Sequence, residues 1–151
     1  MKREGREERE VNSESEKCEY VASIIVDAAI KVHRALGPGL LESAYQQCLV
    51  YELVERGLDV KCEVPVPVIY KDVHIEVGYR VDMIIENSVI IENKTVEHIL
   101  PIHEAQLLTY LKLTGIQIGF LINWNVQLLK NGIKRFVINT PEPQWRQLKS
   151  S

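Results

Sequence analysis

Two short apolar segments with a polar loop between them constrain the fold of this chain more than any other feature. Residues 81–85 and 89–91 are rich in valine and isoleucine, which favour strands, and the polar residues 86–88 lie between them. A hairpin with a three-residue loop, 86–88, sets Asp82 directly across from Glu92, with Cβ atoms ~5 Å apart. A two-residue loop, 87–88, would instead set Asp82 across from Asn93 and send the two acids to opposite faces. Any chemistry shared by Asp82 and Glu92 therefore requires the longer loop or a bulge.

A lysine and a helical pair accompany these acids. Strand alternation sends Glu92 and Lys94 to the same face, and Gln106 and Tyr110, four residues apart, share one face of a predicted helix. Two carboxylates beside an ammonium group suit a divalent cation and a water molecule, as in phosphodiester hydrolysis. The alternative is an ordinary salt-bridged patch. The charges directly follow a Val-Ile-Ile run, however, and unpaired charges at the end of a buried strand are costly.

The spacing of these residues resembles a known nuclease pattern. The chain is similar to the PD-(D/E)xK nuclease superfamily, and to its QxxxY branch in particular, at Gly78, Asp82, Glu92-x-Lys94 and Gln106-x-x-x-Tyr110. Upstream it resembles the motif of the small bacterial and archaeal GxxExxY proteins, at Gly39-Leu-Leu-Glu42-Ser-Ala-Tyr45. The resemblance extends from about residue 20 to residue 136, with Val81 where the superfamily name has proline.

The resemblance implies a role for each of these residues. It implies Mg²⁺ or Mn²⁺ held by Asp82, Glu92 and the helix-borne Glu42, and a catalytic set completed by Lys94, Gln106 and Tyr110. Glu42 has a second interpretation, because an acid in the first turn of a helix interacts favourably with the helix dipole. Tyr45 and Tyr110 are equally consistent with core aromatics whose hydroxyl groups are tied to a carboxylate.

Two function classes fit this pattern. The leading hypothesis is a Mg²⁺- or Mn²⁺-dependent nuclease that cleaves DNA in repair or defence. The alternative is an inactive nuclease-fold module that binds nucleic acid or a protein partner. The full set favours activity, because a binding module has no chemical need for an acid pair beside a lysine. The pattern leaves open DNA or RNA, endo- or exonuclease action, and one metal or two. A small domain has little surface for target recognition, so we expect a homodimer or a partner protein.

Basic residues are concentrated in the last third of a chain whose net charge is −3. Residues 105–151 contain six basic residues and one acidic residue, a distribution that suits contacts with phosphates. The expected nucleic-acid contacts are Arg80, Lys112, Lys130, Lys134 and Arg135. Arg80 has an equal alternative in an ion pair with Glu76 or Glu42, and the basic excess is equally consistent with a solvated face.

An α/β fold with the PD-(D/E)xK core is expected, a mixed sheet flanked by helices in the order α-α-β-β-β-α-β-β. Apolar stripes predict helices at residues 20–36, 40–56 and 102–113. Strands are predicted at residues 58–70, 74–85, 89–96, 116–124 and 133–138, with turns at Lys71-Asp72 and Asn131-Gly132.

Length and composition indicate one domain. A chain of 151 residues with 46% hydrophobic content fits a single nuclease-like domain at 18–140, followed by a tail at 141–151. The charged segment 1–17 has too few apolar residues to offset its ordering entropy, so we expect a disordered arm. No apolar run approaches the ~20 residues of a membrane span, and the charged start is unlike a signal peptide. We therefore expect a cytoplasmic protein with no membrane partner.

Overall fold

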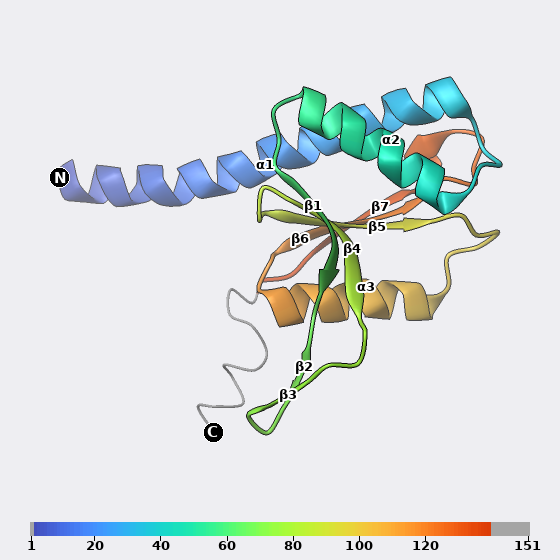
Figure 1. The fold of residues 1–151 in the computed structure, drawn as a ribbon. Helices are drawn as coiled ribbons and strands as arrows, with labels where there is room; N and C mark the ends of the chain where they lie inside the picture. The colour runs from blue at the N-terminus through green and yellow to red at the C-terminus, as the bar shows by residue number, and fades with distance from the viewer. Residues whose placement is uncertain (1, 140–151) are drawn as a thin grey trace.

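The structure, a computed structural model, describes residues 2–139, with side chains from residue 14 onward. Within this range five strands form a mixed sheet in the order β1-β4-β5-β6-β7 (Figure 1). These strands are β1 (Val60–Pro65), β4 (Arg80–Ile85), β5 (Val89–Lys94), β6 (Ile118–Asn123) and β7 (Ile133–Val137). Neighbours are antiparallel except β5 and β6, which are parallel and are connected through helix α3 (Pro101–Thr114). The predicted α/β fold with a mixed sheet is confirmed.

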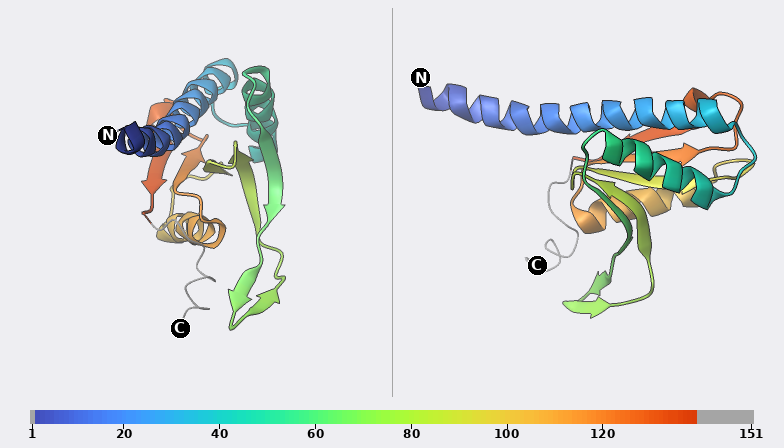
Figure 2. Two further views of the ribbon diagram at one scale, coloured as in Figure 1. Left: turned by 90° about the vertical axis from the view of Figure 1, so that its left-hand side faces the viewer. Right: turned by 45° about the horizontal axis from the view of Figure 1, so that its top comes forward.

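Helices cover both faces of the sheet (Figure 2). Helices α1 (Lys2–Leu36) and α2 (Glu42–Glu55) pack on one face, where the apolar stripe of α1 meets Met83, Ile91 and Trp124 in a buried cluster. Helix α3 packs on the other face against a second cluster that includes Ile84, Ile90 and Leu121. Because successive strand residues point to opposite faces, the apolar strands β4 and β5 supply both clusters.

The first helix is longer than predicted. Within the segment 1–17, where a disordered arm is expected, the structure describes a helix from Lys2 onward, and this part of α1 projects beyond the domain (Figure 1). The expectation rested on burial alone. Glutamate, lysine and arginine are strong helix formers, and adding residues to a helix already nucleated by packing costs less than starting a new one. The domain boundary near residue 18 stays a prediction.

Each of two long predicted strands divides into two shorter ones. The predicted strand 58–70 becomes β1 and β2 (Val68–Tyr70), because Pro65 and Pro67 lack the N–H that a sheet ladder needs. The predicted strand 74–85 becomes β3 (Val73–Ile75) and β4. Strands β2 and β3 form a hairpin that projects from the sheet (Figure 2), and its turn at Lys71-Asp72 is confirmed. The remaining helices and strands match their predicted positions within about three residues, except that a short 3-10 helix, η1 (Leu129–Asn131), precedes Gly132.

Other expectations concern the C-terminal tail and the membrane. The predicted tail at 141–151 lies outside the described residues. No helix in the described range is both long enough and apolar enough to cross a membrane. Cys18, Cys48 and Cys62 are free thiols.

Candidate active site

The β4–β5 hairpin has the register that brings the two acids together. Its paired residues are Met83 with Ile91, Ile84 with Ile90 and Ile85 with Val89, so the loop is 86–88. Glu86 and Asn87 take positive φ angles of 52° and 51°, and the Ser88 amide donates to the Ile85 carbonyl at 2.9 Å. The three-residue loop is confirmed, and Asp82 and Glu92 are the next opposite positions along the two strands.

The regular sheet pairing stops where the acids begin. Beyond Met83 and Ile91, each carboxylate accepts a main-chain N–H from the opposite strand. Oε2 of Glu92 accepts the amide of Asp82 at 2.7 Å, and Oδ2 of Asp82 accepts the amide of Asn93 at 2.8 Å. Main-chain donors thus orient both carboxylates. Among the described residues no hydrogen bond engages the second oxygen of either group, which leaves both oxygens free for another ligand.

Burial makes the charged form of both acids costly. Glu92 is 4% exposed, and burial followed by the charge of Asp82 raises its pKa to about 8. Burial also raises the pKa of the half-buried Asp82 to about 6, with further increases from the charges of Glu42 and Glu63. The Lys94 ammonium acts in the opposite direction on both pKa values but does not offset burial. Two carboxylates that repel each other in a poorly hydrated place fit a divalent cation, which removes the repulsion and the desolvation cost together.

The predicted supporting residues lie on the same face of the sheet as Glu92. Lys94 is the half-buried last residue of β5, two positions from Glu92, and strand alternation places both on the face covered by α3. Tyr110 of α3 is 3% exposed, and its hydroxyl accepts a hydrogen bond from Nε2 of Gln106 at 3.1 Å. Burial and then the charge of Glu92 raise the pKa of Tyr110, so its hydroxyl lies within electrostatic reach of the acid pair. Asp82, Glu92, Lys94, Gln106 and Tyr110 are therefore brought into one region.

The model of the PD-(D/E)XK nuclease superfamily matches residues 19–136, which is most of the chain and contains the whole of this region. The chain belongs to the PD-(D/E)XK nuclease superfamily. Searches of curated proteins and of solved structures found no match. The superfamily part of the resemblance seen in the sequence is confirmed, and the mixed sheet between helices agrees with the PD-(D/E)XK core.

Glu42, the third acid implied by the resemblance, stands apart from this pair. It is the first residue of α2, on the face of the sheet opposite α3. Its charge raises the pKa of Asp82, so it lies within electrostatic reach. In the described part of the chain, however, no three His, Cys, Asp or Glu side chains are close enough together to hold a metal ion. The structure thus places Glu42 within electrostatic reach of Asp82 without joining the three acids into one ligand cluster.

Tyr45, in the segment 39–45, holds the connection between α1 and α2. Its hydroxyl donates to the Gly37 carbonyl at 2.5 Å and accepts the Leu40 amide at 3.1 Å. Its ring is fully buried and stacks on Trp124 with centroids 4.8 Å apart. Gly39 has a φ of 101°, a conformation that favours glycine. Tyr45 is a core aromatic, as the alternative interpretation expected, but its hydroxyl is bound by main-chain groups and not by a carboxylate. The glycine and tyrosine of this segment shape a turn.

A buried polar network, missed in the sequence, holds β5 in place. Asn93 is fully buried between Glu92 and Lys94 but faces α2. Its Oδ1 accepts the Trp124 indole N–H at 2.9 Å, and its Nδ2 donates to Oε1 of Gln46 at 3.1 Å. The Trp124 amide also donates to the Lys94 carbonyl at 2.9 Å. These bonds fix the rotation of β5 and so the direction of the side chains on either side of Asn93. The available signal was an asparagine that strand alternation sends to the opposite face from Glu92 and Lys94.

Two of the five expected nucleic-acid contacts are paired with acids. Lys134 forms an ion pair with Glu104, and Arg135 forms a two-nitrogen pair with Glu19. These pairs were not predictable from local sequence patterns, because the partners come from α3 and α1, far away in the chain.

The other three expected contacts lack such partners. Lys112 and Lys130 are exposed and form no ion pair among the described residues. Arg80 is also exposed, and it donates to the Glu63 carbonyl at 3.4 Å. The alternative ion pair of Arg80 with Glu76 or Glu42 is absent within the described range.

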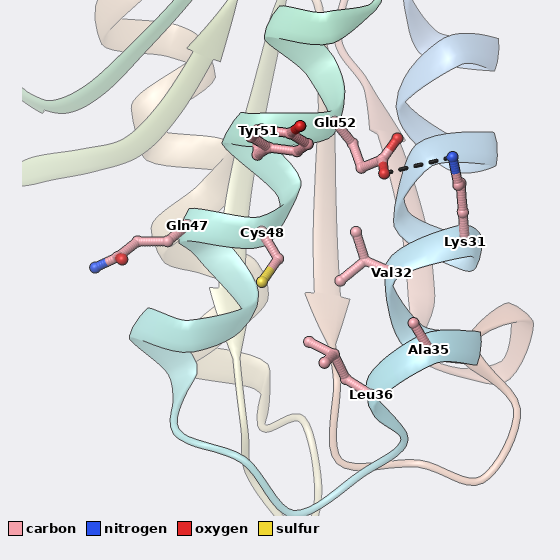
Figure 3. A pocket seen from close by; sticks show the side chains of 8 residues that line it. All are labelled: Lys31, Val32, Ala35, Leu36, Gln47, Cys48, Tyr51 and Glu52. Carbon is pink, nitrogen blue, oxygen red and sulfur yellow. Dashed lines mark ion pairs between the residues drawn. The ribbon is translucent and has the colours of Figure 1, made fainter.

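An apolar groove of about 430 Å³ lies between α1 and α2 (Figure 3). Its walls include Val32, Leu36 and Cys48, and Lys31 and Glu52 form an ion pair of 3.5 Å at one side. The groove contains none of the residues expected to act in catalysis or in binding nucleic acid. The groove is therefore not a candidate catalytic site, and the acid pair stays the candidate active site.

Proposed function

We propose that this protein is a nuclease of the GxxExxY type that hydrolyses phosphodiester bonds in DNA with bound Mg²⁺ or Mn²⁺. The observation that carries the proposal is the pair Asp82 and Glu92, each oriented by a main-chain donor of the opposite strand and each with one free oxygen. Both acids have raised pKa values, which is typical of a site prepared for a charged ligand. Superfamily membership supports the reaction class.

The donor set fits the proposed metal. Mg²⁺ and Mn²⁺ prefer oxygen ligands, and Mg²⁺ is commonly bound through one or two carboxylates together with water and substrate phosphate oxygens. Asp82 and Glu92 would hold the ion, and Glu42 would contribute through its charge, which already acts on Asp82. The bound ion would supply positive charge for the developing phosphorane and would lower the pKa of a water molecule.

Side chains of this protein complete the proposed chemistry. The Lys94 side chain shares the face of Glu92, and its charge acts on both acids, so it could orient the attacking water or stabilise a non-bridging phosphate oxygen. The Tyr110 hydroxyl and the Gln106 amide present polar groups from the α3 side and restrict solvent there. Asn93 acts through the backbone, because it keeps β5 from rotating.

One observation favours the alternative, an inactive nuclease-fold module that binds nucleic acid or a protein partner. Within the described residues only two acids, and not three, are grouped at the site. A site that had lost a ligand would keep the fold and the basic surface without turnover. Metal-dependent cleavage separates the two functions.

The test is cleavage of single-stranded, duplex and branched DNA and of single-stranded RNA, with Mg²⁺, Mn²⁺ or EDTA. We expect cleavage of DNA that requires the metal and is lost in Asp82→Asn. Asp59→Asn is the matched control, because Asp59 is exposed and lies next to β1 at the end that pairs with Ile85, away from the acid pair. Metal-independent cleavage, or equal cleavage by wild type and Asp82→Asn, would count against the proposal. Binding without cleavage on every substrate would establish the inactive module.

A further inference from the structure

A second cavity, with both charged and apolar lining, lies at the C-terminal end of α1, separate from the acid pair. It has a volume of about 390 Å³ and lies between the last turn of α1 and the segment 127–130. Its lining combines two cations, Arg34 and Lys130, with the apolar side chains of Ile30, Pro38 and Leu128. A cavity with cations and apolar walls suits a ligand that has an anionic part and a flat or apolar part.

The two cations are available to a ligand. Arg34 and Lys130 are exposed, and among the described residues neither forms an ion pair, in contrast to Lys134 and Arg135. Carbonyl groups at the end of a helix disfavour an anion, but here two of them are engaged. The His33 carbonyl accepts the Gly37 amide at 2.7 Å, and the Gly37 carbonyl accepts the Tyr45 hydroxyl at 2.5 Å. The positive side chains therefore dominate the local field.

The cavity is connected to the strand that carries Glu92 and Lys94. His33, which lines the cavity, is 5% exposed, and its Nε2 lies 3.2 Å from the Trp124 carbonyl. The amide of the same Trp124 donates to the Lys94 carbonyl at 2.9 Å. One residue thus separates the cavity wall from the main chain of Lys94, and the ends of α1 and β5 point to the same side of the molecule (Figure 1).

We propose that this cavity binds one nucleotide of a nucleic-acid strand. The phosphate lies between the Arg34 guanidinium and the Lys130 ammonium, because arginine offers a two-pronged donor and lysine a compact charge. The base or sugar packs against Ile30, Pro38 and Leu128. The claim that this nucleotide belongs to the strand being cut rests on the proposed function. Nucleotide binding in the cavity does not depend on that function.

The first experiment tests the cavity alone. Deoxyadenosine monophosphate, deoxyadenosine and inorganic phosphate are each titrated into ¹⁵N-labelled protein in EDTA, and amide shifts are followed by NMR. We expect the monophosphate to shift residues 30–38 and 127–131 and to bind more tightly than either fragment. Arg34→Gln/Lys130→Gln should raise its Kd about tenfold or more, since two charge-assisted contacts are lost. Lys61→Gln is the matched control, because Lys61 lies near the β4–β5 loop at the opposite end of the strands.

Each outcome of this first experiment bears on the proposal. Shifts confined to the acid pair, or an equal loss of affinity in Lys61→Gln, would overturn it. Equal affinities for inorganic phosphate and the monophosphate would also overturn it, because the apolar walls would then contribute nothing. Both substituted side chains are exposed, so the double variant should keep the thermal transition of the wild type.

A second experiment tests whether the nucleotide belongs to the substrate. Single-stranded DNA of twelve nucleotides is bound to Asp82→Asn protein, with and without the double substitution, over a range of salt concentrations. We expect weaker binding and a salt slope smaller by about 0.7, the value for one phosphate on a single strand. Unchanged DNA affinity beside weakened monophosphate binding would restrict the cavity to free nucleotides and refute the substrate role. If the wild type cuts no DNA while monophosphate binding stands, the proposed function fails and the cavity remains.

Discussion

Removing one acid of the pair should stabilise the metal-free protein at neutral and alkaline pH. In EDTA, Asp82→Asn keeps an oxygen that can accept the Asn93 amide but removes one of two negative charges beside each other. Most substitutions at a buried polar position destabilise a protein. The opposite sign is expected here, because the wild-type site carries charge that only a cation neutralises.

The magnitude follows from the pKa values of the two carboxyl groups. The pKa of Glu92 is about 8 instead of 4.5, so its ionisation in the folded protein costs up to roughly 5 kcal/mol, of which burial is the larger part. Asp82, with a pKa of about 6, is half-buried, and solvent screening reduces its share. Asp82→Asn removes the Asp82 share and the repulsion on Glu92, and we expect a gain of roughly 2 kcal/mol at pH 8.

The stabilisation expected for Asp82→Asn depends on pH within a defined window. A carboxyl group with a raised pKa in the folded state loses protons first in the unfolded state, so stability falls as pH rises from its ordinary pKa to its folded pKa. That window extends from about pH 4 to pH 8 for this pair. Below it both groups are protonated in both states, and the difference between variant and wild type should approach zero.

Urea unfolding in EDTA at several pH values measures this difference, with Asp59→Asn as a control whose effect should not change with pH in the same way. Saturating Mn²⁺ should reverse the order, since an ion at one hundred times its Kd stabilises the wild type by about 2.7 kcal/mol. A variant less stable than wild type at pH 8 in EDTA, or a difference that does not depend on pH, would refute the reasoning.

Three further predictions concern neighbouring residues. Lys94→Ala should reduce cleavage by roughly 10²–10⁴ while the stabilisation by Mn²⁺ stays intact or grows, and residual cleavage equal to wild type would identify a contaminant. Asn93→Ala should lower the free energy of unfolding in urea by about 1–3 kcal/mol, because the Trp124 indole loses its acceptor. It should also lower kcat more than it raises KM, and an unchanged kcat would show that Asn93 has no positioning role. Lys112→Gln should weaken DNA binding and its salt slope more than Lys134→Gln does, because Glu104 already neutralises Lys134, and the reverse order would show that this ion pair opens on binding.

The hairpin that carries the acid pair was predictable from the sequence. Two β-branched segments around a loop that contains asparagine, together with the period of two along a strand, predicted that Asp82 and Glu92 share a face only if the loop has three residues. The structure has that loop. The helices were predictable for a similar reason, because an apolar stripe is a local property of the sequence.

The turns inside the long predicted strands were harder to place. Pro65 and Pro67 indicated an edge strand, but not that the chain would leave the sheet and return as a projecting hairpin. Alternating valines are compatible with one long strand or two short ones, and the choice depends on which partners are present. Residues 2–17 are a different case. Their helix continues α1, whose later residues are the ones that pack against the domain.

The sequence by itself determined the superfamily pattern, the acid pair with its lysine, and the loop length that their shared face requires, because each depends on residues close together in the chain. The structure supplied the register itself. Only the tertiary structure decided which charges are free. Glu19 neutralises Arg135 and Glu104 neutralises Lys134 from distant elements, while Arg34 and Lys130 meet at one cavity. It also decided that Asn93, Trp124 and Gln46 form one network. Such contacts join residues that are far apart in the sequence. They depend on how the helices pack on a twisted sheet, and a local sequence pattern contains no information about that packing.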